Sequence, residues 1–352
     1  MSRSPVKVVK VGDLLIGGGH PVSVQSMTKT RTADVASTVR QIRRMEKAGC
    51  EAVRLAIVDH NDAHALHAVK KSVRIPVIAD IHFDYRLAIA ALASGADKIR
   101  INPGNIGASW KITSVIRAAK DRGVPIRIGI NTGSLPGPIL KKYGHPNPAA
   151  IAATLRDALR IFRANNFRDI VISVKGCDVP DTVAAYRQVR REFKYPLHLG
   201  ITEAGRAFRG GIKSAVGLGI LLHQRIGDTI RVSLTADPVH EIVAGYEILS
   251  ALNLRQRGPI LISCPTCGRC QVDLIRVADE VERRLQNYRR HMKVAVMGCV
   301  VNGPGEAREA DFGIACGRSV GAVFAKGKEV RRVSESKLCD TLFEVIDENI
   351  NH

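Results

Sequence analysis

Short β-branched segments alternate with helix-like segments through the first 258 of the 352 residues. The strand-like segments are 21–27, 52–57, 76–83, 98–104, 127–133, 170–176, 197–205 and 229–235. Apolar residues at helical spacing recur between them, at 33–49, 109–123, 148–166 and 237–252. Eight alternations within about 250 residues are typical of a (β/α)8 TIM barrel. An open doubly wound sheet is the alternative, but no dinucleotide-binding fingerprint follows the first strand.

The pattern changes after residue 258. Strands are predicted at 259–264, 294–301 and 312–317, helices at 272–286 and 337–349, and a hairpin at 321–334. The sequence therefore predicts an α/β protein in which a TIM-barrel domain, 1–258, precedes a small α+β domain, 259–352.

The chain carries a formal charge of +20, and nearly all of this excess lies in its first part. Residues 1–258 contain 39 basic and 20 acidic side chains, whereas residues 259–352 contain 14 and 13. Such a positive field indicates a polyanionic partner, either nucleic acid or a phosphorylated substrate. The amino terminus lacks the apolar core of a secretory signal, and no stretch reaches the ~18 apolar residues of a membrane span. We therefore expect a soluble, cytoplasmic protein without a membrane partner.

Polar residues recur near the carboxyl ends of the predicted strands, where barrel enzymes place their reactive groups. Basic side chains stand on five of these strands, at Arg54, Arg100, Arg127, Lys175 and Arg231. Their acidic or neutral neighbours at the same ends are Asp80, His82, Asn102, Asn131, Glu203 and Ser233. Because arginine matches phosphate oxygens bidentately, the pocket is expected to bind a small phosphorylated or diphosphorylated substrate.

Asp80, His82 and Glu203 are the acid/base candidates, since proton transfer needs a carboxyl or imidazole group at the reacting face. Gly210 and Gly211 precede a helix expected to begin near residue 213, and its first amides would offer a second phosphate contact.

The second domain contains a cysteine cluster. Cys264, Cys267 and Cys270 follow one another at two-residue gaps in SCPTCGRC, and Cys299 lies within GCVVNGPGEA. This spacing indicates a metal site and leaves zinc and an iron–sulfur cluster open. It also leaves Cys270 and Glu306 as competitors for a fourth ligand position.

The motifs VQSMT, ADIHFDYRLA, RINPGNIG, RIGINTGSL, GITEAG, SCPTCGR and GCVVNGPGEA resemble those of the bacterial 4-hydroxy-3-methylbut-2-enyl diphosphate synthase family, over nearly the whole chain. The resemblance implies one [4Fe-4S] cluster held by Cys264, Cys267, Cys299 and Glu306, with Cys270 as a bystander. It also implies flavodoxin or ferredoxin as electron donor and a homodimer whose active site is shared between subunits.

The expected reaction is the reductive ring opening of 2-C-methyl-D-erythritol 2,4-cyclodiphosphate in the methylerythritol phosphate route to isoprenoids. Two other functions compete with it. The basic charge would suit an iron–sulfur protein that binds or modifies RNA, although only 4% of the residues are aromatic and few stacking surfaces result. The other is a zinc-stabilised barrel that binds a pterin-like diphosphate ester.

Overall fold

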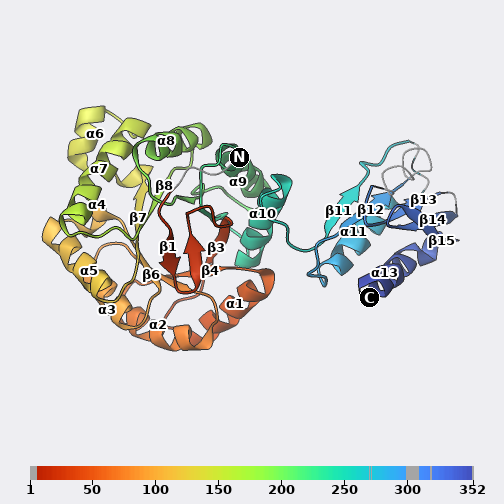
Figure 1. The fold of residues 1–352 in the computed structure, drawn as a ribbon, viewed down its shortest axis with the longest axis horizontal. Coiled ribbons are helices and arrows are strands. Elements are labelled where there is room, and N and C mark those ends of the chain that lie inside the picture. The colour runs from red at the N-terminus through yellow and green to blue at the C-terminus, as the bar shows by residue number, and fades with distance from the viewer. Residues whose placement is uncertain (1–5, 269, 271, 299–308, 318, 351–352) are drawn as a thin grey trace. The chain divides into compact units, whose positions relative to one another are not determined.

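The computed structural model describes residues 6–268, 270, 272–298, 309–317 and 319–350. The chain divides into two compact units, Met1–Arg255 and Gln256–His352, which we call the barrel unit and the cysteine unit. Both units are drawn in Figure 1.

Eight parallel strands form the barrel, in the order β8-β7-β6-β5-β4-β3-β10-β9 (Figure 1). They are β3 (Ser23–Met27), β4 (Ala52–Ala56), β5 (Val77–Ile81), β6 (Lys98–Ile101), β7 (Ile126–Asn131), β8 (Ile170–Lys175), β9 (His198–Leu199) and β10 (Thr229–Ile230). A parallel bridge between Ile172 and Leu197 joins β8 to β9 and closes the ring. The predicted TIM barrel is therefore confirmed.

Helices surround these strands and bury their apolar faces against them. They are α1 (Val35–Ala48), α2 (His60–Ser72), α3 (Tyr85–Ala93), α4 (Pro103–Ile106), α5 (Ser109–Asp121), α6 (Gly137–Tyr143), α7 (Pro148–Ala164), α8 (Val179–Glu192), α9 (Ala207–His223) and α10 (Pro238–Ala251), with a 3₁₀ turn at Thr132–Ser134. Aspartate side chains accept a first-turn amide hydrogen bond in α1, α2, α3, α8 and α10. These caps fix where each loop after a strand becomes a helix.

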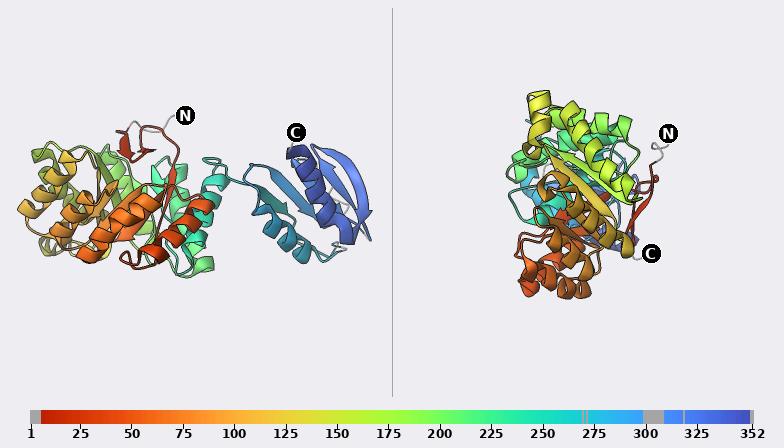
Figure 2. Two further views of the ribbon diagram at one scale, coloured as in Figure 1. Left: turned by 90° about the horizontal axis from the view of Figure 1, so that it is seen from below. Right: turned by 90° about the vertical axis from the view of Figure 1, so that its left-hand side faces the viewer.

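A short hairpin covers one end of the barrel (Figure 2). Its strands, β1 (Val9–Val11) and β2 (Leu14–Ile16), pack against Val171 at the beginning of β8. Gly12 at its turn lies beside Pro76 and Asp97, which directly precede β5 and β6. The hairpin therefore closes the amino ends of the strands. The sequence pattern did not predict it, because its two strands have only three residues each.

Two details of the prediction were wrong. Strands β9 and β10 have two residues each, because the chain leaves the sheet well before the ends of the expected segments 197–205 and 229–235. Gly210 and Gly211 do not precede a helix but lie inside α9, which begins at Ala207. A side chain at residue 210 would meet the Leu234 side chain at 2.7 Å and the Gly205 carbonyl oxygen at 2.9 Å, so close packing explains this glycine.

The cysteine unit is a five-stranded sheet in the order β11-β12-β13-β14-β15. Its elements are β11 (Ile260–Ser263), α11 (Leu274–Leu285), β12 (Lys293–Met297), β13 (Phe312–Cys316), β14 (Val320–Ala325), β15 (Lys328–Ser334), a 3₁₀ turn at Glu335–Lys337 and α13 (Leu338–Ile350). The first three strands are parallel, and β14 and β15 form the predicted hairpin. Residues of α11 and α13 share a buried core with the sheet. The predicted small α+β domain is confirmed.

Candidate active site

Asp80 lies between two arginines at the carboxyl end of the barrel. The Arg100 Nη1 atom is 3.1 Å from Asp80 Oδ1, and Arg54 Nε is 3.5 Å from Asp80 Oδ2. The pairing of β5 with β6 sets Asp80 directly opposite Arg100. Burial alone would raise the pKa of Asp80, but Arg54, a hydrogen bond from His82 and Arg100 outweigh it and hold this pKa well below its usual value. Asp80 therefore stays ionised and orients its neighbours.

His82 stands above this carboxylate, one residue beyond the end of β5. Its Nε2 atom lies 3.5 Å from Asp80 Oδ2 and 3.3 Å from Arg100 Nη1, and about half of its side chain is exposed. An exposed imidazole oriented by a carboxylate can exchange protons with a bound molecule.

Arg127 and Lys175 lie in the interior of the barrel on β7 and β8. The Arg127 Nη1 atom donates to Gln25 Oε1 at 3.4 Å, which reaches across the barrel from β7 to β3. The Lys175 Nζ atom lies 3.3 Å from His198 Nε2. Burial, followed by repulsion from Arg54, lowers the pKa of both Arg127 and Lys175 well below the usual values. A bound anion would therefore favour the charged forms of both side chains.

Arg231, just after β10, is held by a carboxylate that the sequence analysis missed. Its Nε and Nη2 atoms lie 3.3 and 3.5 Å from the two oxygens of Glu241 on α10. Its Nη1 atom and the Arg54 guanidinium both contact the sulfur of Met27. Arg231 and Arg54 are therefore neighbours on one side of the barrel mouth.

A further cation, Lys98, was also missed. It is fully buried on β6, and among the described residues its Nζ atom has no hydrogen-bond partner. Burial, then repulsion from Arg127 and Arg54, lowers its pKa well below the usual value. The signal was present in the sequence, because Lys98 stands two residues before Arg100 and so shares its face of the strand.

Two glycines, one within β7 and one directly after β9, make room for the charged side chains. A Cβ atom at residue 129 on β7 would lie 2.4 Å from Arg100 Nε, and one at residue 200 would lie 2.6 Å from Lys175 Nζ. Glycine within a strand often marks such a close approach. These positions therefore belong to the geometry of the pocket.

The remaining predicted residues lie around the mouth. Asn102 is buried, and its Oδ1 accepts from the Gly104 amide at the start of α4, so this oxygen is already engaged. Asn131 ends β7 and Ser233 follows β10, both half-buried. Glu203 is exposed in the loop before α9 and has a φ of +53°, a strained conformation for a non-glycine residue that clusters at functional sites.

The charges of the pocket do not balance. Its six basic residues are Arg54, Lys98, Arg100, Arg127, Lys175 and Arg231. Among the described residues, the carboxylates that pair with them are Asp80 and Glu241. An anion of two or more charges, such as a diphosphate, would offset this excess of positive charge.

The cysteine unit brings two predicted cysteines close to Gly298, the residue before Cys299. Cys264 Sγ accepts a hydrogen bond from the Gly298 amide at 3.4 Å. A Cβ atom at residue 298 would lie 2.5 Å from Cys270 Sγ, and this thiol donates to the Val272 carbonyl at 3.3 Å. Cys267 is exposed. Cys299 and Glu306 lie outside the described residues. Among the described residues, no three metal-ligating side chains converge, but the amide hydrogen bond to Cys264 Sγ is of the kind found around iron–sulfur clusters.

Comparison with known proteins identifies the chain's relatives. Residues 6–246 match the GcpE TIM-barrel domain, and residues 260–348 match the GcpE protein C-terminal domain. The chain belongs to the GcpE family. It is 55% identical to the 4-hydroxy-3-methylbut-2-en-1-yl diphosphate synthase (flavodoxin) of Geobacter sulfurreducens, over 98% of each chain. The enzyme of the same name from Clostridium perfringens is 51% identical over 99% of each chain. The family predicted from the motifs is therefore confirmed.

Solved structures support the fold alone. The dihydropteroate synthase of Stenotrophomonas maltophilia matches with a TM-score of 0.53 and 15% identity, over 71% of this chain and 97% of that one. The Yersinia pestis enzyme in complex with a sulfonamide drug has a TM-score of 0.53 and 11% identity, over 71% and 100%. These identities give the pterin-binding alternative no support beyond a shared barrel. Within the described residues no helix is long and apolar enough to span a membrane.

Proposed function

We propose that this GcpE-family chain converts 2-C-methyl-D-erythritol 2,4-cyclodiphosphate into 4-hydroxy-3-methylbut-2-enyl diphosphate. The reaction takes in two electrons and two protons and releases one water, as the ring carbon–oxygen bond to phosphate and a hydroxyl are lost. The observation that carries the proposal is the unbalanced ring of cations inside a barrel of this family. The RNA-binding alternative is not favoured, because the chain belongs to the GcpE family and the six cations of the candidate site lie within the barrel or at its mouth.

The barrel residues bind and orient the substrate. Arg54, Arg100, Arg127, Lys175, Arg231 and Ser233 hold the diphosphate, and Asn102 and Asn131 orient the carbon skeleton. A bidentate arginine contact fixes two phosphate oxygens at once, so several contacts leave the ring little freedom.

Protons are handled by Glu203 and by the pair Asp80 and His82. The structure supports a division of labour within the pair, since the ionised Asp80 lies 3.5 Å from His82 Nε2 and keeps the ring in place. Glu203 donates a proton to the leaving hydroxyl. Its exposure and strained backbone at the barrel mouth support this role.

We assign residues 1–258 to substrate binding and residues 259–352 to one [4Fe-4S] cluster. Cys264, Cys267, Cys299 and Glu306 hold the cluster, which supplies single electrons when bound. Flavodoxin or ferredoxin reduces it. We place the reaction in the cytoplasm, where thiols such as the seven free cysteines of the described chain stay reduced.

We further assign the chain to a homodimer in which the cysteine unit of one copy covers the barrel of the other. An apolar stripe on α9 supports association between copies, since Phe208, Ile212, Val216 and Ile220 follow one another every four residues and are 37 to 80% exposed. Light scattering checks the mass, and a monomer at micromolar concentration would contradict this assignment.

Anaerobic turnover tests the function. The cluster-loaded full chain, given the cyclodiphosphate and chemically reduced methyl viologen, should form the dehydroxylated diphosphate, detected by mass spectrometry. Glu203→Gln should abolish product while the cluster absorption persists. Absence of product from iron-replete wild-type protein would refute the proposal, and a colourless protein without iron or sulfide would refute the cluster.

A further inference from the structure

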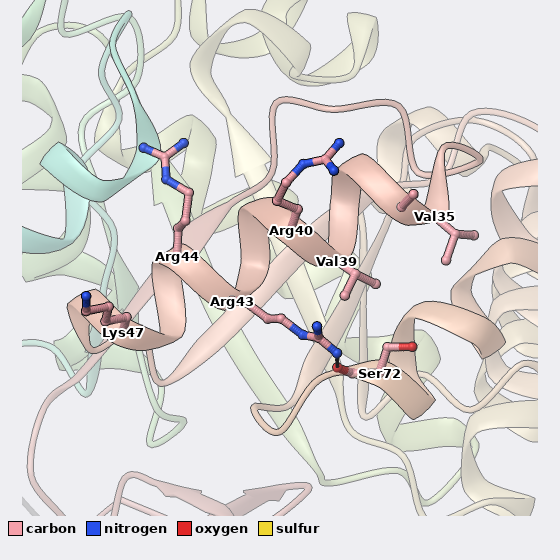
Figure 3. A pocket seen from close by; sticks show the side chains of 8 residues that line it. Val35, Val39, Arg40, Arg43, Arg44, Lys47 and Ser72 are labelled. Atoms are coloured by element: carbon pink, nitrogen blue, oxygen red, sulfur yellow. Dashed lines mark hydrogen bonds between the residues drawn. The ribbon is translucent and has the colours of Figure 1, made fainter.

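Helix α1 presents a basic face to solvent. We define the α1 basic face as Arg40, Arg43, Arg44 and Lys47. Successive members are three, one and three positions apart, which places all four on one side of the helix. A hollow of about 650 Å³ lies along this face, lined also by Val35, Ala36, Val39 and Ser72. Figure 3 shows the long basic side chains along the helix, with Val35 and Val39 beside them.

The charge of this face is only partly neutralised. Arg44 pairs with Asp237 at 2.8 Å. Arg40 donates to a serine hydroxyl at 3.2 Å, and Arg43 donates to the Ser72 carbonyl at 3.4 Å, as the dashed line in Figure 3 marks. Within the described chain, neither Arg40 nor Arg43 forms an ion pair. The lining residues include no acidic and no aromatic side chain.

The carboxyl end of α1 adjoins the segment that leads into the cysteine unit. The Gly49 carbonyl accepts a hydrogen bond from the Tyr246 hydroxyl at 2.9 Å. Glu51 pairs at 3.1 Å with Arg255, the last residue of the barrel unit. The carboxyl end of α1 therefore lies close to the last residue of the barrel unit.

We propose that the α1 basic face is the docking surface for the acidic protein that supplies electrons. This inference rests on the proposed function, which needs such a donor. Complementary charge steers a protein partner to its site and raises the association rate. Val35 and Val39, which line the hollow, give a docked protein apolar contact. A nucleic acid fits less well, because single-stranded binding sites use aromatic stacking that this face lacks.

Donor-dependent kinetics test the proposal. In the cluster-loaded full chain, Arg40→Glu/Arg43→Glu should lower kcat/KM for reduced flavodoxin at least tenfold at low ionic strength. Turnover with reduced methyl viologen should remain unchanged, because this small reductant needs no docking surface. The matched control Arg117→Glu/Arg168→Glu changes the same charge at two exposed positions elsewhere on the barrel and should lower kcat/KM for flavodoxin less than threefold. Added salt should weaken the wild-type flavodoxin reaction and have little effect on the α1 variant.

Other outcomes would overturn either the docking proposal or the proposed function. An equal loss in the control variant would reduce the effect to net charge and overturn the proposal. An unchanged flavodoxin reaction in the α1 variant would also overturn it, and loss of tRNA binding in that variant alone would assign the face to nucleic acid. If wild-type protein makes no product even with methyl viologen, the proposed function fails, and flavodoxin binding by calorimetry still tests the docking face.

Discussion

Glu241 should prove to be the principal buried support of the barrel mouth. Its side chain is almost fully buried. Oε2 accepts from Ser26 Oγ at 2.7 Å and from Arg231 Nε at 3.3 Å. Oε1 accepts from the Leu234 amide at 3.0 Å and also lies within 3.6 Å of Arg231 and Lys29. The substitution Glu241→Gln keeps the shape but replaces one accepting oxygen with a donor and removes the charge.

The size of the effect follows from these contacts. Removing one partner of a buried ion pair costs about 3–5 kcal/mol, and partial exposure of Lys29 and Arg231 reduces this to roughly 2–3 kcal/mol. A loss of this size should lower the Tm of a unit of this length by about 4–12 °C. The KM for substrate should rise as well, because Arg231 loses its support.

Differential scanning calorimetry of the full chain measures the change. The control is Asp157→Asn, which removes an exposed i,i+3 ion pair with Arg160 and should shift Tm by less than about 2 °C. A Tm for Glu241→Gln within the range of this control would refute the reasoning that the buried carboxylate holds the mouth together.

Three further predictions follow from the same geometry. Gly129→Ala should raise the substrate KM at least tenfold, because the new methyl displaces the Arg100 guanidinium, whereas Gly219→Ala in open space on α9 should leave it unchanged; steady-state kinetics decide. Burial, then repulsion from a neighbouring lysine, lowers the pKa of His198, so the unfolded state binds more protons below pH ~6.5. As the pH falls from about 6.5 to the lowered pKa, the free energy of unfolding of the wild type should therefore fall by about 1.4 kcal/mol per pH unit relative to that of His198→Gln. Urea unfolding measures both profiles, and parallel pH profiles would contradict this. Finally, Cys270→Ala should keep its iron content and visible absorption, and loss of both would make Cys270 a ligand.

The sequence predicted those parts of the site that depend on local periodicity. Asp80 was grouped with His82, and Arg100 with Asn102, because side chains two apart on a strand share a face. The register of β5 with β6 then sets Asp80 opposite Arg100. The same rule predicts that Lys98 shares a face with Arg100, because it lies two residues before it on the strand. The sequence also shows a glycine at position 129 within a predicted strand. The reason for it becomes clear only from the structure, which shows that the Arg100 side chain lies against it.

Contacts that depend on tertiary packing were not predictable. Glu241 reaches Arg231 from the first turn of α10, and only the packing of that helix on β3 brings it to Ser26. Gly210 was expected just before a helix, because glycine more often marks turns than close packing within a helix. The hairpin at the amino end was missed since three-residue strands give too little alternation to recognise.

Two groups of cations within the first 258 residues lie in different surroundings. Six cations lie inside the barrel or at its mouth, where water is scarce, and two carboxylates act on them at contact distance, as the proposed diphosphate would. The cations of the α1 basic face lie in solvent, where charges separated by more than about 8 Å are screened at physiological salt. Ionic strength therefore distinguishes the two. The substrate KM should respond weakly to added salt and kcat/KM for flavodoxin should respond strongly, so a salt titration of both constants tests the assignment of the two groups.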